Sequence, residues 1–189
     1  FGSLQALLEK RELKRAAAIA LDPRSGAIRA MVSLPSFDNN LFAEGISTEE
    51  YRKLSEDPSE PLFNRALSGE YPPGSTIKPV VAAAALAESV VTPSTILDGL
   101  GGILRIGAFS FRDWQAHGPS DIRRAIAESN DIFFYTIGGG YGGIRGLGME
   151  RMKWYENLFG YGTETGIDMP GEADGFIPDP EWKKEKKGE

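Results

Sequence analysis

Ser75 and Lys78 are the two residues in this sequence whose types and spacing point most directly to chemistry. Three positions apart, they would share one face of a helix, with their Cβ atoms about 5–6 Å apart. Pro79 lacks an N–H group and its ring crowds the carbonyl four residues earlier, so the helix must begin close to Ser75. A serine at a helix start with a lysine one turn further on is a candidate for an activated nucleophile. A capping serine followed by a surface lysine is the commoner origin of this spacing, so other residues must decide between the two.

A lysine that accepts a proton must be neutral, and an unperturbed lysine is almost wholly protonated at pH 7. Its surroundings must therefore favour the neutral amine. Residues 75–88 are dense in Ala, Val and Leu without a polar stripe, which predicts a buried helix that would provide such surroundings.

Ser129, Asn130 and Asp131 form a second polar group, inside a helix that we predict over residues 120–137. Serine and aspartate are disfavoured in helix interiors, and polar groups in a buried helix need partners. Taken alone, this segment is explained better by a serine that is satisfied within its own helix. Together with the first pair, it resembles the serine acyl-transfer set in which S-x-x-K is followed by S-x-N or a variant.

The elements that must position these residues mix helices with short strands. Two apolar runs over 16–21 and 27–34 flank the turn 22–26, whose proline and glycine predict a β-hairpin. Without a regular alternation of strand and helix, an α+β fold is favoured over a doubly wound sheet. The other predicted elements are helices over 4–14, from 47 onward and over 149–159, strand-like pieces between 92 and 114, and a glycine-rich loop over 138–148.

Composition excludes several classes of protein. The 189 residues carry 21 Lys and Arg against 27 Asp and Glu, and this net charge of −6 argues against a nucleic-acid binder, which needs a basic face. Cysteine is absent, so a thiol nucleophile and a cysteine-ligated zinc site are excluded. The most apolar uncharged run, 79–87, is far shorter than the ~20 residues of a membrane-spanning helix. The sequence starts inside a helical pattern at Phe1 and stops in a charged stretch at Glu189, so we expect it to be an excerpt of a longer protein.

Seven further segments follow one another in a recognisable order along nearly the whole sequence: AIALDP (18–23), AMVSLPSFD (30–38), NRA (64–66), YPPGS (71–75), FRDW (111–114), AIAES (125–129) and TGIDMPGE (165–172). With the two polar groups, they resemble the transpeptidase domain of class B penicillin-binding proteins, closest to the elongation-type, penicillin-binding protein 2-like members. The resemblance implies an α+β penicillin-binding/β-lactamase-like fold in which an antiparallel sheet packs with helices.

The resemblance also implies roles for individual residues. Ser75 would be the acylated nucleophile, Lys78 the base that activates it, and Ser129 the group that passes the proton to the leaving group. Asp131 stands where most relatives have asparagine and would orient Lys78 or the substrate amide, which leaves the charge state of this pair open. The substrate-binding residues implied are Gly74, Trp114 and Asn130, and no cofactor is implied.

The reaction implied is attack on a D-Ala-D-Ala stem peptide of peptidoglycan, release of the terminal D-Ala, and transfer of the acyl group to an amine on a neighbouring strand. β-Lactam antibiotics would be trapped on the same serine. The full-length protein would act at the outer, periplasmic face of the cytoplasmic membrane, anchored by an N-terminal segment absent from this sequence, together with the cell-elongation machinery. The alternatives are a serine β-lactamase and a β-lactam-sensing or non-catalytic binding domain.

One part of the family pattern is missing. No Lys-Thr-Gly or Lys-Ser-Gly occurs, and the nearest strings are ETG (164–166) and KKG (186–188). In the family, the strand with this motif also supplies one of the two backbone N–H donors of the oxyanion hole. Losing one such donor elsewhere has cost roughly 2.7–4 kcal/mol. We therefore expect residues 1–189 to be the N-terminal part of a transpeptidase domain that is inactive alone, with the third motif on a second chain or a missing segment.

His117 is the only histidine, and a lone histidine in a loop is more often a packing residue than a catalytic one. Some elongation-type relatives bind a metal through two aspartates, a histidine and a cysteine, which match Asp98, Asp113, His117 and Asn130 here. Because asparagine is a poor zinc ligand, no metal site is predicted, and whether the first three residues bind a metal is left open.

Overall fold

The computed structural model describes residues 1–188, which divide into two compact units. Unit 1 contains Phe1–Tyr71 and Gly166–Ala173, and unit 2 contains Pro72–Thr165 and the residues from Asp174 onward. Among residues 1–188, none of the helices combines the length and apolar character that a membrane span requires.

The predicted β-hairpin is present in unit 1 and pairs β1 (Ala16–Leu21) with β2 (Ile28–Leu34) in antiparallel register. The turn between them is held by the Asp22 carboxylate, which accepts the N–H of Arg24 at 3.0 Å and the guanidinium of Arg29 at 2.8 Å. Gly26 takes a φ of +72° at the end of the turn, as its type allows. The proline, glycine and aspartate of this turn thus fix the hairpin locally.

Three helical segments complete unit 1: α1 (Gly2–Arg11), the 3₁₀ turn η1 (Asn39–Phe42) and α2 (Thr48–Ser55). Helix α2 begins where predicted, with Ser47 as its cap: Ser47 Oγ accepts the N–H of Glu50 at 3.2 Å and donates to its carboxylate at 2.6 Å. The first helix ends before the predicted Lys14, since Glu12 adopts a left-handed conformation with a φ of +53°.

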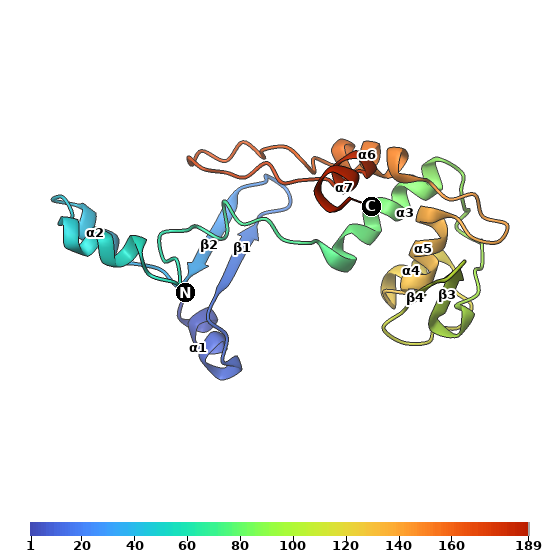
Figure 1. Cartoon of the computed structure of the whole chain (residues 1–189), viewed down its shortest axis with the longest axis horizontal. Coiled ribbons are helices and arrows are strands. Elements are labelled where there is room, and N and C mark those ends of the chain that lie inside the picture. Colours follow the sequence, from blue (N-terminus) through green and yellow to red (C-terminus); the bar gives the residue numbers. More distant parts are fainter. Residues whose placement is uncertain (189) are drawn as a thin grey trace. The chain divides into compact units, whose positions relative to one another are not determined.

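The core of unit 2 is built by four helices: α3 (Lys78–Ala87), α4 (Ile122–Ala127), α5 (Asp131–Gly139) and α6 (Met149–Leu158) (Figure 1). Small residues let α3 approach its neighbours, because Ala84 and Ala85 are completely buried. The predicted burial of this alanine-rich helix is therefore confirmed. Against it pack Val91, Ile122, Ala125, Phe133, Phe134, Ile137 and Leu147.

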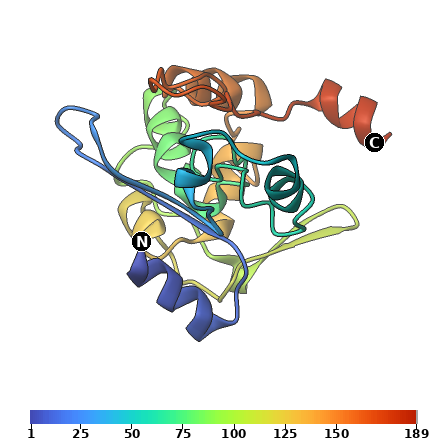
Figure 2. The same cartoon turned by 90° about the vertical axis from the view of Figure 1, so that its left-hand side faces the viewer.

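A second hairpin in unit 2 follows the 3₁₀ turn η3 (Leu100–Gly102) and pairs β3 (Ile103–Ile106) with β4 (Phe109–Arg112). Figure 2 shows its two strands running side by side. These are the short strands predicted between 92 and 114. With two antiparallel hairpins among the helices, the architecture is α+β, as predicted.

Helix α7 (Pro180–Lys187) was not predicted from the charged sequence around it. Asp179 caps it by accepting the N–H of Trp182 at 2.9 Å, and Pro180 occupies the first turn. The pair Asp179-Pro180 could have predicted this helix, since aspartate is a common cap and proline suits the first helical position.

Candidate active site

Ser75 lies in a 3₁₀ turn, η2 (Gly74–Ile77), and not in the first turn of an α-helix as predicted. The α-helix α3 begins only at Lys78, whose N–H bonds to the Ser75 carbonyl. Pro79 then sits in the first turn of α3, where its missing N–H leaves no intrahelical bond unmade. Gly74 has a φ of +56° directly before the serine, a conformation that would strain a residue with a side chain. This turn presents Ser75 on the exposed surface.

The helix predicted over 120–137 is wrong as one element, because it is broken into α4 and α5 at Ser129. Ser129 has a φ of +54°, and hydrogen bonds from two backbone N–H groups end α4 at this point. The Ser129 N–H donates to the Ile126 carbonyl at 3.2 Å, and the Asn130 N–H donates to the Ala125 carbonyl at 2.9 Å. This is a Schellman motif with a serine where glycine is usual. Asn130 then caps α5, since its side-chain oxygen accepts the N–H of Phe133 at 2.9 Å.

The four predicted catalytic residues are brought together in unit 2 by these two turns. Ser129 Oγ donates to Ser75 Oγ at 2.8 Å. Lys78 Nζ donates to Ser129 Oγ at 2.9 Å, to the Ser129 carbonyl at 2.7 Å and to Asp131 Oδ1 at 2.5 Å. Lys78 therefore reaches the predicted nucleophile through the hydroxyl of Ser129.

The surroundings of Lys78 differ from the purely apolar pocket that the sequence led us to expect. Its side chain is only 9% exposed, yet three oxygen acceptors match the three N–H groups of an ammonium ion. The ring of Phe134, which sequence reasoning did not single out, lies with its centroid 5.4 Å from Nζ, within cation–π range. Three oxygen atoms therefore surround Lys78 Nζ, and the Phe134 ring lies against it.

The three predicted substrate-binding residues occupy different environments. Gly74 shapes the turn before Ser75, as described above. Trp114 is 65% exposed, donates through Nε1 to the Glu128 carbonyl at 3.3 Å, and lines a hollow of about 450 Å³ together with Ser129. Asn130 is 1% exposed and its amide is used to cap α5. Their contacts with substrate stay predictions.

Asp113 and His117 form a buried pair, with His117 Nδ1 3.0 Å from Asp113 Oδ2. Burial alone would raise the pKa of Asp113, but hydrogen bonds from His117 and from the backbone N–H groups of Asp131, Ile132 and Trp114 together lower it below the usual value. Asp113 is thus held as a carboxylate. Sequence reasoning did not identify its contact with the N-terminus of α5.

The residues that match a metal site in some relatives do not fit a metal here. Asp98 Oδ1 accepts the N–H of Leu100, both nitrogens of His117 contact Asp113 or Gln115, and the Asn130 oxygen caps α5. Among the described residues, no group of three or more His, Cys, Asp or Glu side chains could hold an ion.

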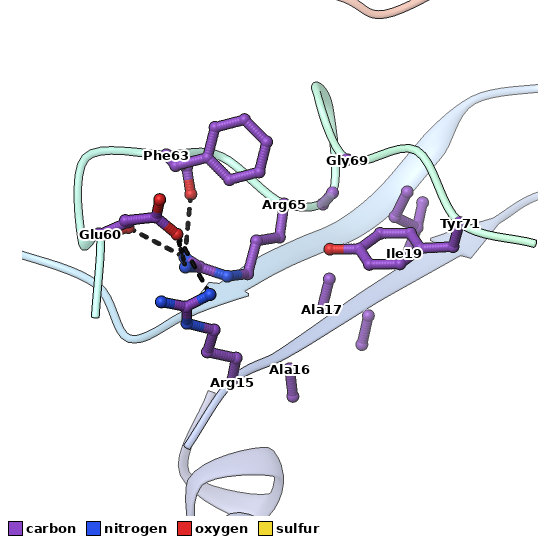
Figure 3. Close-up of a pocket in the computed structure, with 11 residues that line it drawn as sticks. Arg15, Ala16, Ala17, Ile19, Glu60, Phe63, Arg65, Gly69 and Tyr71 are labelled. Atoms are coloured by element: carbon purple, nitrogen blue, oxygen red, sulfur yellow. Dashed lines mark hydrogen bonds and ion pairs between the residues drawn. The ribbon is translucent and has the colours of Figure 1, made fainter. Parts of the chain in front are cut away.

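A hollow of about 630 Å³ in unit 1 is lined by residues 16–19 of β1, by Arg15 and by residues between 60 and 71 (Figure 3). Arg15 and Arg65 both reach the Glu60 carboxylate at its edge, at 3.2 Å each. Arg65 is nearly buried and also donates to the backbone carbonyls of Ser59, Glu60 and Phe63. These contacts fold the loop over 59–65, so we assign the two arginines a structural role.

Comparison with known proteins agrees with the fold and the order of motifs. The chain is 42% identical over 175 residues to the peptidoglycan D,D-transpeptidase MrdA of Haemophilus influenzae, covering 91% of this chain and 26% of that protein. The match to MrdA of Escherichia coli K12 is also 42% identical, over 91% of this chain and 27% of that protein. The chain thus spans about a quarter of the length of these relatives.

Solved structures give the same result. The Pseudomonas aeruginosa PBP2 structure, a complex with WCK 5153, matches with a TM-score of 0.78 at 37% identity, covering 100% of this chain and 42% of that one. PBP2 from Helicobacter pylori matches with a TM-score of 0.83 at 32% identity, covering 100% and 34%. The family model for the penicillin-binding protein transpeptidase domain matches residues 16–188. The chain belongs to the penicillin-binding protein transpeptidase family.

Proposed function

We propose that this chain is part of a D,D-transpeptidase that cross-links peptidoglycan stem peptides through an acyl-enzyme on Ser75. The observation that carries the proposal is the hydrogen-bonded chain from Ser75 through Ser129 to Lys78, with links of 2.8 and 2.9 Å. An exposed hydroxyl joined in this way to a buried amine is the arrangement that serine acyl transfer needs. The relatives named D,D-transpeptidase support the same reading.

In the first half of the reaction, Ser75 Oγ attacks the carbonyl carbon between the two D-alanines. The Ser75 proton passes by way of the Ser129 hydroxyl to the neutral amine of Lys78. Asp131 Oδ1, 2.5 Å from Lys78 Nζ, holds this amine in place. Carbonyl electrons move onto the oxygen to give a tetrahedral oxyanion. The Ser75 N–H is one donor available to stabilise that charge.

In the second half, the tetrahedral intermediate collapses and the bond to the terminal D-Ala nitrogen breaks. Lys78 donates to Ser129 Oγ while the Ser129 hydroxyl gives its proton to the departing amine. The hydrogen bonds in the structure run in this direction, from Lys78 to Ser129 to Ser75. An amine on a neighbouring strand then attacks the ester by the reverse path, and a β-lactam would leave a stable acyl group on the same serine.

Substrates, partners and location of the full-length protein follow as proposals from the same reading. The H. pylori PBP2 structure has been solved as a complex with MreC, which supports a contact of this protein with the cell-elongation machinery. Cross-linking of stem peptides takes place on the outer, periplasmic side of the cytoplasmic membrane. The full-length protein would be held there by an N-terminal anchor outside residues 1–189.

We further propose that the Lys-Thr-Gly motif lies outside these residues, on a missing segment or a second chain, since the sequence contains neither Lys-Thr-Gly nor Lys-Ser-Gly. We expect the 189-residue chain to be labelled by fluorescent penicillin about 10²–10³-fold more slowly than the full-length protein, because one oxyanion donor is absent. Labelling rates of the two proteins measure this, with circular dichroism as a control for folding. Equal rates would overturn this proposal.

The alternatives are separated by following the adduct in the full-length protein. A transpeptidase holds the penicilloyl group for many minutes and releases D-Ala from a stem-peptide analogue. A β-lactamase clears the adduct within seconds. A β-lactam-sensing domain keeps the adduct but turns over no depsipeptide.

A further inference from the structure

We propose that Asp113, supported by His117, is a positioning residue that holds Ser129 and Asp131 in their reactive arrangement through hydrogen bonds, without a metal ion. The inference rests on the proposed function, because it explains how the turn with two of the catalytic side chains is fixed. It arises from the backbone contacts of Asp113, which are independent of the contacts that Lys78 makes on the other side of that turn.

Asp113 acts on the first turn of α5 from outside the helix. The first N–H groups of a helix have no intrahelical partner and need acceptors. Asp113 Oδ2 accepts the N–H of Ile132 at 3.3 Å. Asn130 accepts the next one, that of Phe133. Asp113 therefore fixes the first turn of α5 at Ile132, next to Asp131, the residue whose side chain binds Lys78.

The Asp113–His117 pair is fixed by burial and by further hydrogen bonds. The Asp113 side chain is completely buried and that of His117 is 2% exposed. Asp113 Oδ1 accepts the N–H of Trp114 at 2.8 Å, and its own N–H bonds to the Gly102 carbonyl at 2.9 Å. The backbone at Gly99 packs directly against the backbone at His117, because a Cβ atom on Gly99 would lie 2.0 Å from the His117 carbonyl oxygen. A carboxylate at a helix N-terminus is also favoured by the helix dipole.

The turn needs such support because Ser129 is in a conformation that serine disfavours, with a φ of +54°. A strained residue persists only when its surroundings over-determine it. Lys78 binds its carbonyl from one side, and Trp114 donates to the adjacent Glu128 carbonyl at 3.3 Å. Asp113 fixes the residues that follow, so the turn is held at both ends.

A metal is not needed for this arrangement. The oxygens of Asp113 and the nitrogens of His117 already have partners, and Asn130 uses its oxygen to cap α5. The hydrogen bonds of Asp113 thus join His117 to the first turn of α5 directly.

The test compares Asp113→Asn with a matched control in the full-length protein. The control is Asp121→Ala, which removes a carboxylate that caps α4 by accepting the N–H of Arg124 at 2.8 Å. For Asp113→Asn we expect the acylation rate constant with a penicillin to fall at least about tenfold while the non-covalent dissociation constant stays within about twofold, because misplacement of reacting groups lowers the rate. For Asp121→Ala we expect loss of thermal stability with an acylation rate within about twofold of wild type. Added zinc or a chelator should change neither rate.

An unchanged acylation rate in folded Asp113→Asn, or an equal loss in Asp121→Ala, would overturn the proposal, and so would stoichiometric zinc whose removal slows acylation. If Asp113→Asn does not fold, His117→Gln serves instead, with an expected loss of about threefold. Amide exchange of Ile132 gives a readout independent of acylation: it should accelerate in Asp113→Asn and stay protected in Asp121→Ala. If the wild type forms no adduct but this exchange behaves as expected, the proposed function fails and the positioning role stands.

Discussion

We expect Lys78→Met to lower the rate at which penicillin acylates the full-length protein by about 10²–10⁴-fold, the range that a general base contributes. The amine of Lys78 is the end of the hydrogen-bonded chain that starts at Ser75. Methionine preserves the length and apolar stem of the side chain but can accept no proton. Stopped-flow mixing with a chromogenic β-lactam measures the rate.

Stability provides the control for this variant. Lys78→Met leaves Asp131, whose side chain is 26% exposed, without its cation, and we expect a loss of about 1–3 kcal/mol in the free energy of unfolding. The double variant Lys78→Met/Asp131→Asn should recover most of this stability and none of the acylation rate. Recovery of acylation in the double variant would contradict the assignment of Lys78 as the base.

We expect Ser129→Gly and Ser129→Ala to be almost equally inactive and yet to differ in stability. Both remove the hydroxyl that joins Ser75 to Lys78, so acylation should fall by about 10²-fold or more. Glycine relieves the left-handed conformation at a φ of +54°, whereas alanine retains it. Since that conformation costs an L-residue roughly 1–2 kcal/mol, Ser129→Gly should be the more stable variant by about 1 kcal/mol.

Chemical denaturation of the two variants measures this difference, and Ser120→Gly against Ser120→Ala provides a comparison at a serine that has no positive φ. There we expect alanine to be at least as stable as glycine. If Ser129→Gly were no more stable than Ser129→Ala, the turn at Ser129 would not be strained. If Ser129→Gly retained full acylation, the hydroxyl relay would be wrong.

The elements that could be predicted are those whose determinants are local. The turn around Asp22 and the start of α2 at Ser47 depend on side chains within a few residues, and both were predicted from the sequence. The break at Ser129 was missed because apolar spacing over 120–137 fits one helix. Serine, asparagine and aspartate in succession were the signal, since all three favour caps over helix interiors.

The candidate site could be predicted only in part. Ser75 and Lys78 were identified by spacing, and Ser129 and Asp131 by resemblance to a family, and the structure brings these four side chains together. The contact of Asp113 with the first turn of α5 could not be predicted, because it joins residues 19 positions apart through a fold that spacing does not reveal.

The central claim, that Ser75 is the nucleophile of an acyl-transfer site, is tested most directly by locating the adduct. The full-length protein is incubated with benzylpenicillin, digested, and analysed by peptide mass spectrometry. We predict the penicilloyl mass on the peptide that contains Ser75, and its complete loss in a folded Ser75→Ala variant. An adduct on another residue, or an undiminished adduct in Ser75→Ala, would contradict the account.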